Sequence, residues 1–130
     1  MIKEMDIRCH LFGENFSPKK LKEFAGIVLE NRIEVGDELT KGRFKGKPSP
    51  EGYGVLCPPI EYRNSDDFGL HWVAQKISKH QDDLQKCGVV EIKLVIGVFY
   101  EGQCNFVLEP KAIGLIGELG IPLEISCYHS

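Results

Sequence analysis

Residues 94–100, Leu-Val-Ile-Gly-Val-Phe-Tyr, form an apolar run of the kind that fills the centre of a sheet. Glu-Pro-Lys at 109–111 follows, and it opens an amphipathic stretch that predicts a helix over 110–119. Gly-Ile-Pro-Leu-Glu at 120–124 then leads into a last strand, expected over 121–128. The C-terminal half therefore has the order strand, helix, strand.

The same order occurs near the N-terminus. Ile-Arg-Cys-His-Leu-Phe at 7–12 predicts a strand, and Gly-Ile-Val-Leu-Glu at 26–30 leads into another. Between them, Ser17 can cap a helix, Pro18 suits its first position, and Gly26 can end it in the left-handed conformation. The expected buried side of this helix is Leu21, Phe24 and Ala25.

Between the two halves, residues 36–54 are rich in turn formers, and residues 55–57 predict a short strand. A long helix is expected to start at Asp66 or Asp67 and to run to Lys86. Its buried side is expected to comprise Leu70, Val73, Ala74, Ile77, Leu84 and Cys87, and Trp72 points away from that side. Glu101-Gly102 is expected to turn the central strand into a hairpin with 104–108.

These elements predict an α+β fold in one domain over residues 1–130. We expect a mostly antiparallel sheet with helices packed on one face, built from two loosely repeated strand-helix-strand halves with a ferredoxin-like tendency. At 130 residues, of which 42% are hydrophobic, the chain is long enough for one core.

The composition restricts the possible cellular compartment and the possible classes of partner. No apolar run is long enough for a signal peptide or a membrane span, so a cytoplasmic protein without membrane partners is expected. The five cysteines are scattered and odd in number, which favours reduced thiols over a disulfide framework. A net charge of -3 argues against nucleic acid as a partner.

Two patterns in the sequence partly resemble a metal-binding or a nucleotide-binding motif, and neither matches the spacing that such a site requires. Cys9-His10 and Cys127-Tyr128-His129 lie on strands that can be neighbours in a ferredoxin-like sheet, but adjacent strand residues point to opposite faces, so no metal site is predicted. The glycines at 42 and 46 enclose three residues instead of the four of a phosphate-binding loop. The bases Lys41, Arg43, Lys45 and Lys47 could contact an anion or an acidic partner, although a solvated loop is the favoured interpretation.

No catalytic signature is present, so neither enzyme activity nor a cofactor is predicted. The pair Asp66-Asp67 is expected to cap a helix, and Asp82-Asp83 to lie on exposed turns. Trp72 either packs under a loop, such as 41–54, or anchors a partner.

The chain resembles domain-of-unknown-function family 4279, a family of small bacterial domains. The similar features are an opening strand followed by Ser-Pro-Lys-Lys-Leu at 17–21, the Gly36-Asp37 turn, the long helix near 68–87, and Leu-Ile-Gly-Glu-Leu-Gly-Ile-Pro-Leu-Glu-Ile at 115–125. Such domains resemble immunity proteins of bacterial toxin–immunity systems. The resemblance implies tight binding of a cognate protein toxin without chemistry.

The first hypothesis is accordingly an immunity protein that occludes a toxin's active site, with a nuclease as the expected toxin class, because an acidic face can cover a basic groove. The candidate partner-binding residues are Trp72, Asp66, Asp67, Asp82, Asp83, Glu34, Asp37 and Glu38. A second hypothesis is a small-ligand-binding or sensory domain. A third is an enzyme that uses Cys9 or Cys127 with His129. The oligomeric state stays open.

Overall fold

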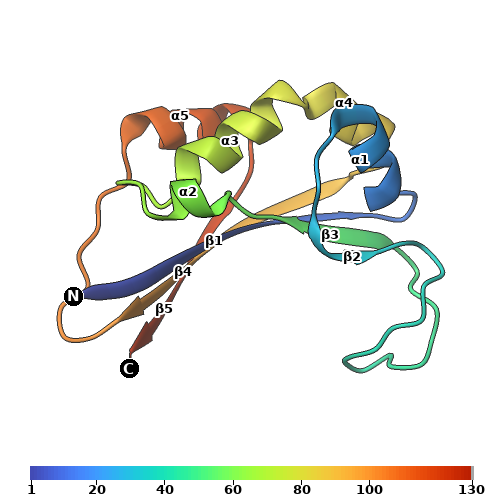
Figure 1. The fold of residues 1–130 in the computed structure, drawn as a ribbon, viewed down its shortest axis with the longest axis horizontal. Helices are drawn as coiled ribbons and strands as arrows, with labels where there is room; N and C mark the ends of the chain where they lie inside the picture. Colours follow the sequence, from blue (N-terminus) through green and yellow to red (C-terminus); the bar gives the residue numbers. More distant parts are fainter. Residues whose placement is uncertain (130) are drawn as a thin grey trace. The chain divides into compact units, whose positions relative to one another are not determined.

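The computed structural model describes residues 1–129 (Figure 1). The helices and strands follow the order β1 (Ile2–Gly13), α1 (Pro18–Ala25), β2 (Glu30–Ile33), β3 (Gly52–Leu56), α2 (Ile60–Arg63), α3 (Leu70–Lys79), α4 (Gln81–Lys86), β4 (Glu91–Tyr100), α5 (Pro110–Leu119) and β5 (Leu123–His129). The strands form a mixed, mostly antiparallel sheet in the order β2-β3-β1-β4-β5. The predicted α+β class is confirmed.

Within this fold the chain divides into two compact units, which we describe separately. The first unit comprises residues 1–9, 57–79 and 93 onward, and the second comprises residues 10–56 and 80–92. β1 and β4 each contribute residues to both units. That residues 1–130 form one domain stays a prediction.

In the first unit, α5 links the parallel strands β4 and β5. The register runs from Leu94 opposite Leu123 to Tyr100 opposite His129. A parallel pair needs such a crossover, so the predicted strand-helix-strand order has a structural basis here. α3 packs against α5, and the two helices lie on one side of these strands (Figure 1). The buried apolar side chains of the unit include Ile7, Cys9, Leu70, Val73, Ile77, Leu94, Ile96, Val98, Ala112 and Ile116.

The predicted hairpin of β4 with residues 104–108 is wrong. Residues 103–109 contain no helix or strand, although Gly102 has the positive φ of 69° that a turn requires. β4 lies between β1 and β5 in the sheet, so both of its hydrogen-bonding edges are already occupied. The segment after the turn therefore runs on as coil to Pro110, where α5 begins.

In the second unit, α1 has the predicted boundaries. Ser17 accepts a hydrogen bond from the Lys20 N–H, Pro18 stands at the start of the helix, and Gly26 ends it with φ 68°. α1 lies against α4 and β3, and its Leu21 is fully buried. Phe24 is 66% exposed, which contradicts the expected buried side. Pro18, Leu21 and Ala25 lie within about 60° on the helix surface, and Phe24 lies outside that stripe.

The predicted long helix over residues 66–86 is interrupted. α3 begins only at Leu70, and a break at His80, with φ −116° and ψ 23°, separates α3 from α4. Phe68 and Gly69 both have positive φ, which is incompatible with an earlier helix start. All six side chains of the predicted buried side are nevertheless buried. The apolar pattern therefore predicted burial correctly across a break that it did not reveal.

Replacing Ser17 by alanine is expected to lower the free energy of unfolding by about 1–2 kcal/mol. The Ser17 hydroxyl caps α1 and also donates to Glu34 Oε1 at 2.5 Å, so its loss leaves two polar groups without a partner. Urea denaturation of Ser17→Ala measures this loss, and Ser17→Thr, which keeps the hydroxyl, should retain most of the stability. Equal stability of the alanine variant and the unaltered protein would contradict the assigned cap.

Candidate partner-binding surface

Trp72 and Tyr62 pack against each other in the first unit. Their ring centroids are 6.0 Å apart, and Lys76 Nζ lies 5.6 Å from the centroid of the Trp72 ring. Trp72 is half-buried, whereas Tyr62 is 44% exposed and Ile60 is 73% exposed. We call Ile60, Glu61, Tyr62, Asp66 and Trp72 the α2 surface. Trp72 thus lies off the buried side of its helix, as predicted, and its indole packs on a neighbouring ring while remaining accessible.

Acidic side chains accompany these apolar groups. Glu61 lies between Ile60 and Tyr62 in α2, and Asp66 follows shortly after that helix; both are exposed. None of the hydrogen bonds or ion pairs found in residues 1–129 involves the Asp66 carboxylate. Aromatic residues are enriched in protein interfaces, and exposed carboxylates can complement the charge of a basic partner.

Asp67, in contrast, serves its own helix. Its carboxylate accepts hydrogen bonds from the Gly69 N–H at 3.1 Å, the His71 N–H at 2.8 Å and the Ser65 hydroxyl at 3.1 Å. Partial burial raises the pKa of Asp67, but the hydrogen bonds from His71, Gly69 and Ser65 outweigh burial and lower the pKa below its usual value of 3.8. The expectation that this pair caps a helix is confirmed for Asp67.

The remaining predicted acids belong to the second unit, where several have internal partners. Glu34 accepts a hydrogen bond from Ser17, and its Oε2 is buried without a partner among the described residues. Asp37 accepts a hydrogen bond from the Glu34 N–H at 2.8 Å. Asp83 lies 3.0 Å from His80 Nδ1. Glu38 and Asp82 are exposed. The predicted partner-binding residues therefore divide into two groups, with Asp66, Asp67 and Trp72 in the first unit.

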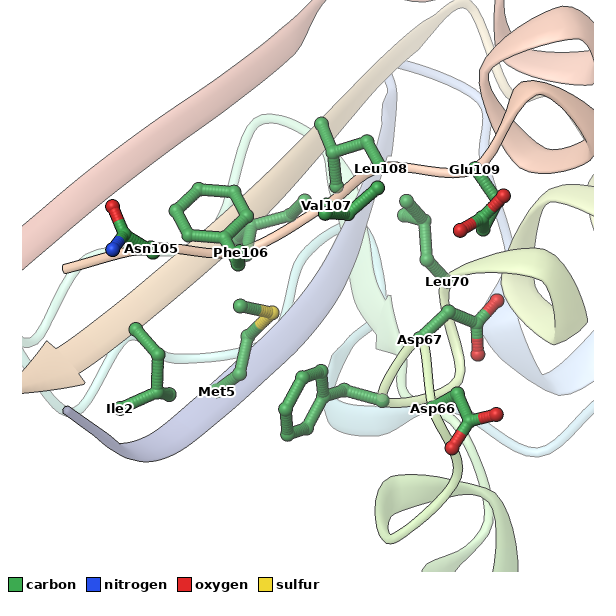
Figure 2. Close-up of a pocket in the computed structure, with 12 residues that line it drawn as sticks. Ile2, Met5, Asp66, Asp67, Leu70, Asn105, Phe106, Val107, Leu108 and Glu109 are labelled. Atoms are coloured by element: carbon green, nitrogen blue, oxygen red, sulfur yellow. The ribbon is translucent and has the colours of Figure 1, made fainter.

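The first unit also contains a pocket that the sequence did not predict (Figure 2). It has a volume of about 220 Å³ and is mainly apolar, with Met5, Leu70 and Phe106 among its lining residues. Figure 2 shows the carboxyl groups of Asp66, Asp67 and Glu109 at one end of the pocket. Residues 105–109 line it because they run as coil after the turn at Gly102. The Met1 ammonium donates to the carbonyl oxygens of Glu101 and Gln103, which holds the start of this coil.

The cysteines do not form a metal site in the described residues. No group of three or more His, Cys, Asp or Glu side chains within residues 1–129 could hold a metal ion. β4 separates β1 from β5, so Cys9 and Cys127 lie on strands that are not neighbours in the sheet. Burial, with a smaller contribution from Cys57, raises the pKa of Cys9 to about 12, and burial also raises the pKa values of Cys87 and Cys104.

Thiol alkylation at neutral pH should discriminate strongly between these cysteines. With a pKa of about 12, Cys9 should form roughly a thousand times less thiolate at pH 7 than an unperturbed thiol does. Cys127, which is exposed, should react with iodoacetamide first and Cys9 last. Peptide mass spectrometry gives the order, and a urea-unfolded sample, in which the differences should vanish, is the control. Rapid, selective labelling of Cys9 in the folded protein would instead support a nucleophilic role.

No helix within residues 1–129 has both the length and the apolar character needed to cross a bilayer. A scan against family models and searches of curated proteins and solved structures find no match to this chain. The resemblance to family 4279 therefore stays a prediction, and the case for a function depends on the surfaces described above.

Proposed function

We propose that this chain is a non-enzymatic immunity protein that binds and neutralises a cognate protein toxin. The observation that carries the proposal is the α2 surface, where a half-buried tryptophan packs on an exposed tyrosine and the same short helix carries an exposed isoleucine. Trp and Tyr contribute a large share of binding energy at protein interfaces because they bury much area at small entropic cost. A monomer gains little from leaving such a group accessible, which favours a partner.

The carboxylates of the α2 surface favour a basic partner, although Lys76 adds one cation on the Trp72 ring. Glu61 and Asp66 are exposed there, and the whole chain carries a net charge of -3. A nuclease presents a basic groove to its substrate, so carboxylates beside an aromatic anchor would complement that groove and accelerate association. Occlusion of the groove requires no catalytic group on this chain.

The test begins with capture from the native host. The tagged chain should retain one near-stoichiometric polypeptide through high-salt washing, and that polypeptide should be toxic when expressed alone and harmless when expressed with this chain. Trp72→Ala and Tyr62→Ala should each weaken the purified complex by about thirtyfold or more, as expected of interface hot spots.

Phe99→Ala provides a matched control in the same unit. Phe99 is 37% exposed and stacks on Tyr128 with centroids 5.0 Å apart, so this variant also removes a surface aromatic from a ring pair. It should leave the affinity within about twofold. Thermal melting verifies that Trp72→Ala, Tyr62→Ala and Phe99→Ala are folded. A toxin that binds equally well to all three variants would overturn the assignment of the α2 surface.

The pocket of Figure 2 supports a second candidate function, the binding of a small ligand. Its apolar lining and the three carboxylates at one end suit an amine with an apolar tail, because a buried ammonium needs an anionic partner. Such an amine at a hundredfold excess over its Kd should stabilise the protein by about 2.7 kcal/mol. Glu109→Gln should reduce this thermal shift, and an equal shift with the matching fatty carboxylate would contradict this candidate.

A further inference from the structure

The strand β2 contains a bulge in the second unit. Glu30 pairs with Val55 and Ile33 pairs with Tyr53, so three steps along β2 oppose two steps along β3. Within this irregular stretch, Asn31 has a φ of 52°, a left-handed conformation that non-glycine residues seldom adopt. Bulges redirect side chains, and strained backbone persists mostly at functional positions. The two residues affected are Asn31 and Arg32.

Both of these residues line a hollow of about 360 Å³. Its other lining residues include Ile33, Leu39, Lys41 and Tyr53. Two of the lining side chains are cations, and no acidic residue is among them. Within residues 1–129, neither Arg32 nor Lys41 forms an ion pair with a carboxylate. The hollow is therefore a concave surface with an uncompensated positive charge.

The loop beside the hollow carries further cations on a hydrogen-bonded backbone. Residues 41–47 carry four bases and no acid, whereas the whole chain has a net charge of -3. The loop is closed by hydrogen bonds from the Leu39 N–H to the Lys47 carbonyl and from the Gly46 N–H to the Leu39 carbonyl, with further turn hydrogen bonds inside it. Holding like charges together in an ordered loop costs free energy, so an anion that binds there would relieve the repulsion.

Tyr53, which lines the hollow, is held in place by two neighbouring side chains. The Tyr53 hydroxyl lies 2.6 Å from His10 Nδ1, and the Tyr53 ring packs on Phe12 with centroids 5.0 Å apart. The Tyr53 side chain is therefore fixed before any ligand arrives, which lowers the entropic cost of binding. Together with Ile33 and Leu39, it supplies the apolar part of the lining.

We infer that this hollow is a binding site for a small phosphate ester, with the phosphate groups on Arg32 and Lys41 and an apolar or ring portion against Leu39 and Tyr53. A guanidinium binds phosphate oxygens through two parallel hydrogen bonds, and an ammonium adds a mobile point charge. The volume falls in the range of small-molecule sites, and the apolar part of the lining gives a reason for an organic ester to bind better than free phosphate. The site lies within the second unit and is separate from the function proposed above.

Isothermal titration with ATP, inorganic triphosphate and adenosine tests this inference on the full chain. ATP should bind, inorganic triphosphate should bind several-fold more weakly, and adenosine should not bind at about 1 mM. Arg32→Gln and Lys41→Gln should each weaken ATP binding by about tenfold, the value of one charge-assisted contact. Lys19→Gln, which removes an exposed lysine of α1 in the same unit, should change the affinity less than twofold.

Three results would overturn the inference. The first is a flat ATP titration at low ionic strength, and the second is unchanged ATP affinity in both Arg32→Gln and Lys41→Gln. The third is a single-stranded oligonucleotide that binds more tightly than ATP and is weakened by Lys41→Gln, which would assign the cations to nucleic acid. Circular dichroism of each variant verifies that the second unit is folded, so a loss of binding can be attributed to the side chain removed.

Discussion

Replacing Gly52 by alanine is expected to destabilise the protein by about 3 kcal/mol or more. A β-carbon at this position would lie 1.8 Å from the carbonyl oxygen of Phe16 and 2.7 Å from its carbonyl carbon. Both are backbone atoms, so no rotamer change can relieve the clash. Phe16 itself is buried and its N–H bonds to the Gly13 carbonyl, which leaves the backbone little room to move.

Urea denaturation of Gly52→Ala measures this effect, and Gly114→Ala is the matched control. Nothing lies within 4 Å of a β-carbon at Gly114, in the interior of α5, so alanine there should raise the free energy of unfolding by about 0.5–1 kcal/mol. The same glycine-to-alanine change is therefore expected to lower the free energy of unfolding at Gly52 and to raise it at Gly114. A Gly52→Ala protein as stable as the unaltered chain would show that β3 does not approach Phe16 this closely.

Local signals in the sequence predicted α1 and α5 well. A serine cap, a proline at the helix start and a glycine in the left-handed conformation act within one turn of the chain, so neighbouring residues suffice to recognise them. α5 likewise ends at a glycine, Gly120, with φ 67°. The buried sides of α3 and α4 were also predictable from apolar spacing, whereas the same reasoning failed for Phe24 of α1.

Signals that depend on distant partners were not predictable. Residues 104–108 have a strand-like composition, yet they form coil because β5, much later in the chain, occupies the free edge of β4. The first half places β3 between β1 and β2, whereas β4 and β5 are neighbours, so the two strand-helix-strand halves differ in the sheet. No short-range pattern distinguishes these two arrangements.

In the candidate sites, too, local features were predictable from the sequence and features that depend on distant residues were not. Trp72 could be recognised from helical spacing, but Tyr62 could not, because only the folded chain brings α2 against α3. The bases at 41–47 were visible in the sequence, whereas the bulge that presents Arg32 to the same hollow depends on the pairing of β2 with β3. The sequence therefore revealed individual residues of each candidate site, and the fold showed which other residues lie beside them.

Replacing Asp67 by alanine is expected to lower the free energy of unfolding by about 2 kcal/mol, because three hydrogen bonds to one carboxylate are lost at the start of α3. Asp67→Asn should recover only part of the stability at pH 7, because asparagine has one acceptor oxygen where Asp67 accepts hydrogen bonds on both Oδ1 and Oδ2. Chemical denaturation of both variants at pH 7 measures these differences. Alanine and asparagine variants of equal stability would contradict the capping role.

The same residue should also make stability depend on pH in a defined direction. The pKa of Asp67 is lowered on folding, so its contribution is fully present above the usual value of 3.8 and is lost as the pH falls through the lower folded pKa. In acid denaturation, Asp67→Asn should lose less stability than the unaltered protein as the pH falls. Asp66→Asn, which changes an exposed neighbour, should lose as much stability as the unaltered protein. For binding of the proposed toxin the order should reverse, since Asp66 is exposed whereas the Asp67 carboxylate already accepts hydrogen bonds from the Gly69 and His71 N–H groups. A protein in which Asp67→Asn weakens binding more than Asp66→Asn would show that the cap itself contacts the toxin.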